Sequence, residues 1–488
     1  MSARADTIEA ASRAAGERRA RASVLLFFVG LAGVAAVVFW PSISTGFFED
    51  DFGYLNATLG PSWWRSGFFW DFSSQVLRPV TVLGIGLQRE VFGFHPLPFH
   101  LVALGMLVGI GALLYLVSRR LRLGRVGACA AAAVVVLHTT NGWTLSWTAS
   151  TSSFYAELLC LAVIWCIAVP RPGRRGWTAA VVLYALALLS REVSMALPFI
   201  AVLVRWYVVA GRGPDGTAVE GAAPDGDGGI SPWARLRAAL REVVPLFVVL
   251  GVFLAARFGA SAYAKSKPEV PRVVPLLNWT SFSDAFPDIP RHVHDLAVLG
   301  ASPVRSSMDL AGLHFPVAVV VVAVLVWAAI IALTIVDARR GRWLAAVGLG
   351  WFLVGIAPAI FLQPGITYGN YTDLALPGLA LAIGALVQPR VASIPVRLRP
   401  VAAVAGVAVL AVVAWHGGNC LVQPPPPLIT RATQLEAWAR RTYPDPAPGS
   451  TIVVADAQPN DVLWTSNGDL FRAMYDDPSL RVEFRPPG

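Results

Sequence analysis

Long apolar runs, separated by short polar or basic connections, dominate the chain between residues 23 and 416. Runs such as Val24–Trp40 and Pro316–Val336 carry almost no charge and match the roughly 20 residues that a helix needs to cross a membrane. Helices of soluble proteins keep a polar face, which these runs lack. We therefore predict about eleven transmembrane helices. The predicted spans are residues 23–40, 96–117, 126–141, 152–169, 177–190, 194–210, 242–258, 316–336, 343–362, 373–388 and 400–416.

Arginines are concentrated in every second connection between these spans. The basic segments are residues 1–22, Arg119–Arg125, Arg171–Arg175, Arg205–Arg241, Arg339–Arg342 and Arg390–Arg399. Because cytoplasmic loops are enriched in Lys and Arg, this alternation predicts a multi-pass protein of the cytoplasmic membrane, with its N-terminus inside and its C-terminus outside. The net charge of +9 is therefore explained by topology and does not indicate nucleic-acid binding. A composition of 56% hydrophobic and 14% charged residues agrees with a membrane protein.

The predicted domain is a polytopic all-α membrane unit at residues 23–416, preceded by a cytoplasmic tail at residues 1–22. Two outer connections are long, at residues 41–95 and 259–315. The connection at residues 211–232 is rich in Gly, Asp and Pro, which predicts a disordered cytoplasmic linker.

Residues 417–488 form the second predicted unit, a small extracytoplasmic α/β domain. Its expected elements are a helix at Leu428–Arg441, a strand at Thr451–Ala455, a helix at Leu470–Tyr475 and a strand at Leu480–Phe484. So few residues cannot form much of a core, unless the domain packs on the membrane unit.

Three consecutive carboxylates, Glu49, Asp50 and Asp51, follow the first span within the aromatic segment FFEDDFGY. Carboxylates beside hydrocarbon are costly to desolvate, so they are usually paired or used. One of them could act as a general base toward a hydroxyl or amine. Adjacent acids could also hold Mg²⁺ or Mn²⁺. A solvated acidic turn is the alternative.

Two arginines, Arg78 and Arg89, lie in the first outer connection against the general charge trend. Each could neutralise an anion, or simply pair with Glu49 or Glu90. His100, at the start of the second span, has no spacing that indicates a zinc site.

The Ser190–Ser194 segment, SREVS, interrupts an apolar stretch at a later outer turn. An arginine here needs an anionic partner. For Arg191 this is either the neighbouring Glu192 or a phosphate, whose oxygens the guanidinium fork matches. Further along, Tyr368 and Tyr371 precede Asp373 in another outer connection and are weaker candidates. No nucleotide-binding motif is present, which disfavours a nucleotide-driven pump.

The order of these motifs resembles that of a known family. FFEDDFGY after the first span, RPVT from Arg78, FGFHPLPFHL leading into the second span and LSRE ending at Glu192 are together similar to the multi-spanning GT-C glycosyltransferases. Among these, the chain is most similar to the protein O-mannosyltransferases and their bacterial relatives. The resemblance covers residues 25–200, and beyond them only the hydropathy is similar.

The resemblance implies a membrane glycosyltransferase that uses a polyprenyl-phosphate-linked sugar. By this resemblance, Asp50 or Asp51 is the acidic residue of the first outer loop, acting as base and as metal ligand. Arg191 and Arg78 would contact the donor phosphate. The residues expected to support the same cavity are Glu49, Tyr54, His100 and Glu192.

The predicted reaction is an inverting transfer of a hexosyl or pentosyl group, mannose among them, from the lipid carrier. The acceptor is a protein, glycan or lipid of the cell envelope, at the outer face of the membrane. One rival is a transporter or flippase for lipid-linked glycans, which would favour ionisable groups near the middle of the spans. Two others are a non-catalytic envelope-assembly scaffold and a ligase that transfers whole glycans.

Overall fold

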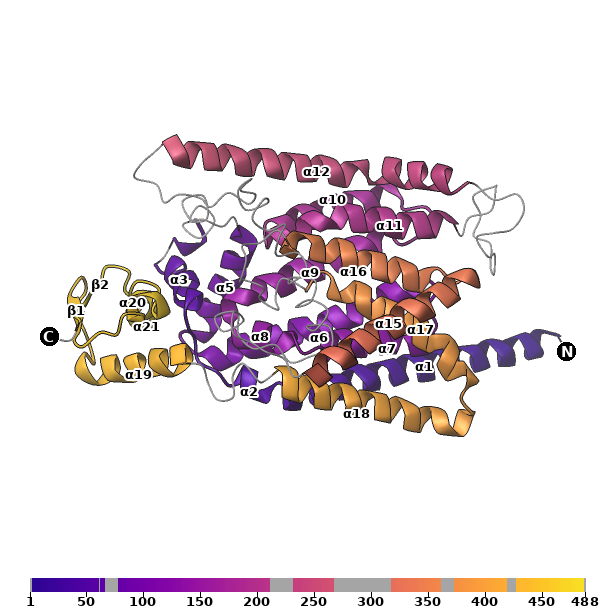
Figure 1. Ribbon diagram of the computed structural model, residues 1–488, viewed down its shortest axis with the longest axis horizontal. Coiled ribbons are helices and arrows are strands. Elements are labelled where there is room, and N and C mark those ends of the chain that lie inside the picture. The colour runs from indigo at the N-terminus through magenta and orange to yellow at the C-terminus, as the bar shows by residue number, and fades with distance from the viewer. Residues whose placement is uncertain are drawn as a thin grey trace.

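The computed structural model describes residues 2–60, 62–65, 78–210, 231–266, 317–360, 373–418 and 427–486. Its long helices form an elongated bundle, with the N-terminus at one end and a small C-terminal unit at the other (Figure 1). Each predicted span coincides with a helix, which confirms the all-α membrane architecture. These helices are α1 (Ser2–Val38), α6 (Pro96–Arg120), α7 (Arg125–Val136), α9 (Ser152–Ile167), α10 (Arg174–Leu188), α11 (Leu197–Ala210), α12 (Pro232–Ser266), α15 (Val317–Arg339), α16 (Leu344–Ile360), α17 (Leu376–Ser393) and α18 (Arg399–Gly418).

Within the described residues, seven helical segments are long and apolar enough to cross a membrane. They are Arg21–Val38, Pro96–Arg120, Thr148–Ile167, Glu192–Val209, Pro232–Gly259, Leu376–Ser393 and Val396–Trp415. Two further segments, Arg125–Val136 and Leu344–Pro358, are apolar but shorter. Shorter helices are tolerated inside a bundle whose other helices span the hydrocarbon.

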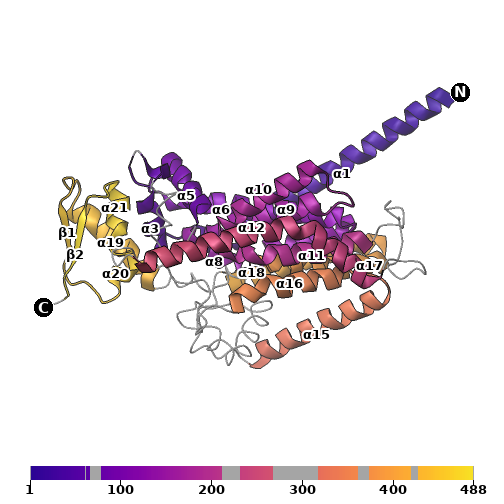
Figure 2. The same ribbon diagram turned by 90° about the horizontal axis from the view of Figure 1, so that it is seen from above.

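The outer helices present apolar side chains to their surroundings. Val252 on α12 is 66% exposed, and Val404 on α18 is 70% exposed. α15 lies at the side of the bundle, apart from its centre (Figure 2). Such apolar surface is unfavourable in water but is what lipid-facing helices carry.

Small residues allow close approach at the centre of the bundle, where α17 packs against α7 and α16. A Cβ added at Gly127 of α7 would lie 2.6 Å from the carbonyl oxygen of Gly384 of α17. A Cβ at Gly348 of α16 would lie 2.6 Å from the backbone nitrogen of Ala382. Close backbone packing through small residues is typical of membrane helix interfaces.

Two helices continue beyond the predicted apolar spans. Residues 2–22 of the expected tail belong to α1, where an Ala- and Arg-rich sequence favours helix. α12 extends past the predicted span at both ends, so residues 259–266 of the expected loop are helical. The remainder of the loop at 259–315, and all but the last two residues of the linker at 211–232, lie outside the described residues.

The first outer connection, residues 41–95, is largely helical where it is described. It contains α2 (Trp40–Ile43, beginning one residue earlier), α3 (Asp50–Ala57) and α5 (Pro79–Phe92). Proline at the first position of α5 suits a helix start, since this position has no intrahelical partner for an N–H group.

The C-terminal unit has the four predicted elements, which are α19 (Pro427–Thr442), β1 (Thr451–Val454), α21 (Asp469–Tyr475) and β2 (Arg481–Phe484). It also has one short helix that was not predicted, α20 (Asp461–Trp464). β1 and β2 pair in parallel, with Thr451 opposite Arg481. Phe48 and Phe52 of the first outer connection share one hydrophobic cluster with Phe471 of α21. The small unit therefore completes its core on the membrane unit, as expected from its size.

Candidate active site

The three consecutive acids after the first span have different environments. Asp51 is fully buried, and its carboxylate accepts N–H bonds from Phe48 (3.2 Å) and Ala149 (2.6 Å). Burial raises the pKa of Asp51 well above its usual range, although these two N–H groups oppose the shift. Asp51 therefore ties the acidic segment to the short helix η1 (Thr148–Thr151).

Asp50 is the accessible carboxylate of the three. Protein surrounds it on most sides, and this partial desolvation raises its pKa, while the positive charge of Arg78 lowers it. Glu49 is half-buried; burial, with a smaller contribution from the charge of Asp50, raises its pKa to about 7. The backbone of Glu49 is in the left-handed region, with φ of 53°, so the turn that presents Asp50 is strained.

Arg78 binds Glu192 through two hydrogen bonds, of 3.0 and 2.5 Å. The start of α5 packs on the turn after α10. The N–H of Val80 donates a hydrogen bond to the backbone carbonyl of Leu189 (3.1 Å), and the hydroxyl of Thr81 donates one to the backbone carbonyl of Ser190 (3.0 Å). The partner in this ion pair is therefore Glu192, whereas one expectation had named Glu49 or Glu90 as the partner of Arg78. The pairing joins the first outer connection to η2 (Glu192–Ala196).

Arg191, adjacent in sequence to Glu192, points elsewhere. It is 2% exposed, and its guanidinium donates hydrogen bonds to the hydroxyls of Ser152 (3.3 Å) and Ser153. Asp373 lies within electrostatic range of Arg191 and accepts a 3.4 Å hydrogen bond from Thr144. The charge of Arg191 also acts on the neighbouring Glu192, while its hydrogen bonds described above go to the two serines.

Glu157 is a buried acid of this region that the sequence analysis did not single out. It is 2% exposed on α9 and interacts electrostatically with Asp373. Its signal was present in the sequence, because it is the single acid of an otherwise apolar span, and an ionisable group inside a membrane span is usually functional.

Two predicted supporting residues, His100 and Tyr54, are buried. His100 is fully buried near the backbone of Thr45 and Leu145. Tyr54 is 5% exposed and belongs to the hydrophobic cluster shared with the C-terminal unit. Tyr368 and Tyr371 lie outside the described residues.

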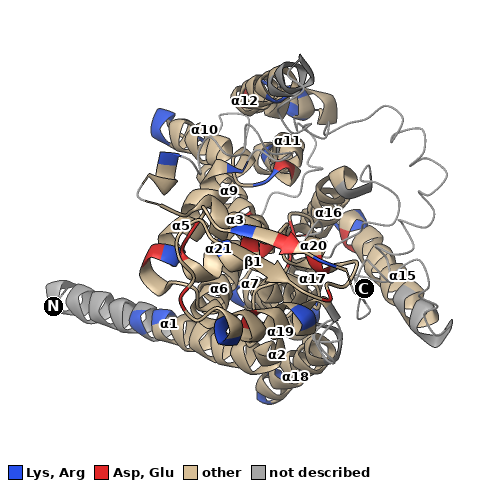
Figure 3. Ribbon diagram, turned by 90° about the vertical axis from the view of Figure 1, so that its left-hand side faces the viewer, with Lys and Arg blue, Asp and Glu red and all other residues tan. Residues whose placement is uncertain are grey.

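The C-terminal unit contacts the acidic segment directly. The N–H of Glu49 donates to the carbonyl of Trp464 (3.2 Å), and the amide of Asn56 donates to Asp469 (2.9 Å). Arg89 pairs with Asp476 at 2.5 Å, and not with Glu49 or Glu90. Figure 3 looks onto this end of the molecule and shows α20 and α21 in front of the bundle near α3.

The region combines an accessible carboxylate, a paired arginine and a buried cluster of acid, arginine and hydroxyl groups. A carboxylate in this setting can take a proton from an incoming hydroxyl or amine, and arginines can stabilise a phosphate. Among the described residues, no group of three or more His, Cys, Asp or Glu side chains is arranged to hold a metal. Of the two predicted metal ligands, Asp50 has accessible oxygens, whereas those of Asp51 accept backbone N–H groups.

Comparison with known proteins gives matches by structure alone. No family model and no curated protein sequence matches the chain. The structure of ArnT from Cupriavidus metallidurans bound to undecaprenyl phosphate aligns with 94% of this chain and 86% of its own length, at 16% identity and a TM-score of 0.51. The apo state of the same protein aligns with 95% of this chain at 17% identity and a TM-score of 0.51.

A second similar structure is the oligosaccharyltransferase of Archaeoglobus fulgidus tethered to an acceptor peptide. It aligns with 94% of this chain and 63% of its own length, at 12% identity and a TM-score of 0.50. ArnT and this oligosaccharyltransferase are GT-C glycosyltransferases. The chain therefore has the GT-C fold, which confirms the resemblance seen in its motifs at the level of fold.

Proposed function

We propose that this protein is a membrane glycosyltransferase that moves a sugar from a polyprenyl-phosphate carrier to an acceptor at the outer face of the cytoplasmic membrane. One observation carries the proposal: within a GT-C fold, the accessible carboxylate of Asp50 lies near the Arg78–Glu192 pair at the end opposite the arginine-rich loops. The ArnT structure with undecaprenyl phosphate supports a lipid phosphate as the carrier. The tethered peptide in the oligosaccharyltransferase structure supports an acceptor site in the same fold.

The proposed reaction is one direct displacement. Asp50 accepts the proton of the acceptor hydroxyl or amine, whose oxygen or nitrogen forms a bond to the anomeric carbon. The bond between that carbon and the phosphate oxygen breaks, and the electron pair leaves with the polyprenyl phosphate. Attack opposite the leaving group inverts the configuration.

Positive charge near the leaving phosphate would stabilise it as its charge develops. Arg78 is the better placed of the two predicted arginines, because its charge acts on Asp50 and its side chain is 12% exposed. Arg191 lies deeper, bonded to Ser152 and Ser153. We propose that it completes the positive region behind the phosphate. If Mg²⁺ or Mn²⁺ takes part, Asp50 is the residue that would hold it, and the ion would add positive charge near the phosphate.

Sugar transfer by purified protein in lipid vesicles tests the proposal. Radiolabelled polyprenyl-phosphate mannose, glucose and arabinose would be offered with an envelope acceptor fraction. We expect Asp50→Asn to lower transfer by at least about a hundredfold, the usual effect of losing a general base. Glu90→Gln removes an exposed acid from α5 and is the matched control, which should transfer as the wild type does.

Equal transfer by Asp50→Asn and the wild type would exclude Asp50 as the base. Failure of the wild type to consume any of the three donors would instead favour a transporter or a non-catalytic scaffold.

A further inference from the structure

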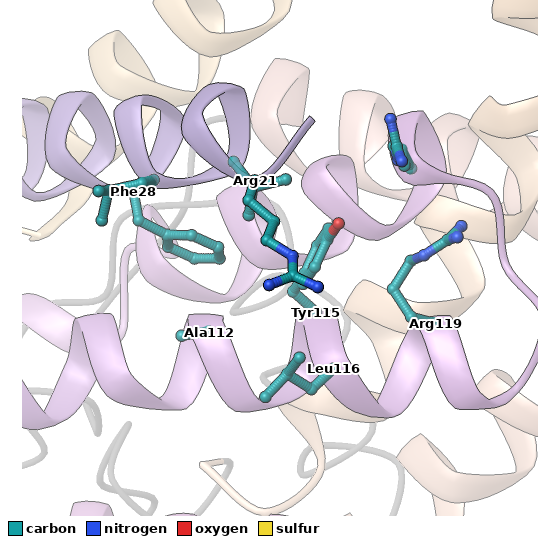
Figure 4. A pocket seen from close by; sticks show the side chains of 9 residues that line it. Arg21, Phe28, Ala112, Tyr115, Leu116 and Arg119 are labelled. Atoms are coloured by element: carbon teal, nitrogen blue, oxygen red, sulfur yellow. The ribbon is translucent and has the colours of Figure 1, made fainter. Parts of the chain in front are cut away.

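A groove lies at the opposite, arginine-rich end of the bundle, between α1 and α6 and beside the start of α7 (Figure 4). Its volume is about 640 Å³. It is lined by Arg21, Val24, Leu25, Phe28, Ala112, Tyr115, Leu116, Arg119 and Arg125. Figure 4 shows Arg21 extending from α1 toward α6, close to Tyr115, with Arg119 further along α6. The proposed transfer reaction uses none of these residues.

The lining has one cationic part and one apolar part. Arg21, Arg119 and Arg125 supply three positive charges, and no carboxylate is among the nine residues that line the groove. The apolar part includes Leu25 and Leu116, which are 66% and 46% exposed. Its wall is formed by Phe28 and Tyr115, whose rings meet edge to face at 5.9 Å. The groove therefore complements a molecule with an anionic head and a long apolar body.

The position of the groove favours a lipid over a soluble anion. Arg21 begins the apolar segment Arg21–Val38, and Arg119 lies near the end of the segment Pro96–Arg120. The arginines are therefore at the level where hydrocarbon meets the headgroups, and the apolar residues lie on the hydrocarbon side of them. By the distribution of charge, this is the cytoplasmic leaflet, where anionic lipids are attracted to basic pockets between helices.

We propose that this groove binds an anionic phospholipid, with its phosphate among the three arginines and an acyl chain along Leu25 and Leu116. The site is separate from the proposed donor site at the outer end, so its occupant is a bound lipid and not the substrate. A headgroup with net negative charge is attracted to the three arginines, whereas a choline headgroup would bring a fourth positive charge to them.

Native mass spectrometry of delipidated protein tests this proposal. The protein would be titrated with phosphatidylglycerol and with phosphatidylcholine of identical acyl chains. We expect the wild type to bind the anionic lipid about tenfold more tightly, on the scale of a few arginine contacts at a membrane surface. The variant Arg21→Gln/Arg125→Gln should lose this preference; both side chains are exposed, so the fold should be retained.

The matched control is Arg174→Gln/Arg175→Gln, which removes two exposed arginines from the start of α10 at the same end of the bundle. It should keep the wild-type preference. Equal binding of the two lipids by the wild type would overturn the proposal. An equal loss in both double variants would also overturn it, because the attraction would then be a diffuse effect of surface charge. Leu25→Ser/Leu116→Ser should weaken the binding of both lipids, and unchanged binding would exclude the apolar part of the site.

Discussion

At the scale of single residues, Asp50 and Asp51 show how one residue type takes two roles in adjacent positions. Asp51 is enclosed, and its oxygens accept two backbone N–H groups, whereas Asp50 lies near Arg78 and keeps an accessible, partly desolvated carboxylate. In Asp51→Asn, one N–H group would face the amide NH₂ and lose its acceptor. A buried donor left unsatisfied costs about 1–3 kcal/mol.

We therefore expect Asp51→Asn to lower the melting temperature of the purified protein, and Asp50→Asn to leave it unchanged. Thermal unfolding followed by intrinsic fluorescence measures this. A reversed order, with Asp50→Asn the less stable protein, would contradict the assignment of Asp51 as the structural acid.

Glu49 gives a prediction about pH. Its pKa is raised from 4.5 to about 7 in the folded protein by burial and by the charge of Asp50. The folded state therefore binds more protons than the unfolded state between these values, so this residue's stabilising contribution is complete below pH 4.5 and is lost as the pH rises through about 7. Glu49→Gln should remove that loss, so the variant gains stability relative to the wild type between pH 5 and pH 8. Melting temperatures measured at several pH values test this. A constant difference in melting temperature between the two proteins from pH 5 to pH 8 would show that Glu49 does not titrate as described.

The sequence could locate the candidate active site but could not predict which of its charged residues pair with one another. Three acids beside hydrocarbon and the SREVS segment were visible as candidates, because charge is costly in those places. The partner of Arg78 is Glu192, 114 positions away, and such a contact depends on how the helices pack. Glu157 could have been found as the single acid of its apolar span, but its proximity to Asp373, far along the chain, could not.

At the scale of elements, the close packing of glycines between α7 and α17 leads to a prediction about stability. Gly127→Ala would place a methyl group 2.6 Å from the carbonyl oxygen of Gly384, so α7 and α17 would have to separate. Overpacking of this kind costs about 1–3 kcal/mol. Gly105→Ala on α6 is the matched control, because nothing lies within 4 Å of the added Cβ. We expect Gly127→Ala to melt several degrees lower, while Gly105→Ala should melt at or slightly above the wild type, since alanine favours helix.

Apolar periodicity predicted the existence of the long helices correctly and their ends less well. Hydrocarbon thickness determines how long an apolar run must be, but nothing requires a helix to end where the run does. α1 and α12 both continue into polar sequence. The elements of the C-terminal unit were easier to delimit, because turns and proline separate them.

At the scale of the whole molecule, the charge asymmetry predicts opposite sides for the two ends of the bundle. In a variant with its native cysteines replaced by serine, a cysteine at Ser479 should react with a membrane-impermeant maleimide in intact cells. A cysteine at Arg174 should react only after the membrane is opened. The reverse pattern would invert the orientation and place the proposed active site in the cytoplasm.

Contacts of the C-terminal unit help to position the proposed catalytic carboxylate. The carbonyl of Trp464 accepts the N–H of Glu49, so the C-terminal unit holds the strained turn that presents Asp50. Asp476→Arg would bring a second cation against Arg89, where the structure has a 2.5 Å ion pair. We expect this variant to become more sensitive to proteolysis between the two units and to lose sugar transfer in the same proportion.

The reciprocal variant Arg89→Glu/Asp476→Arg restores opposite charges and should recover part of both properties. Glu483→Gln alters an exposed ion pair on the same unit and should change neither. If Asp476→Arg loosened the C-terminal unit without any loss of transfer, the unit would not contribute to the active site. A parallel loss and recovery would instead make it part of the site, because the position of Asp50 would then depend on contacts made more than 400 residues along the chain.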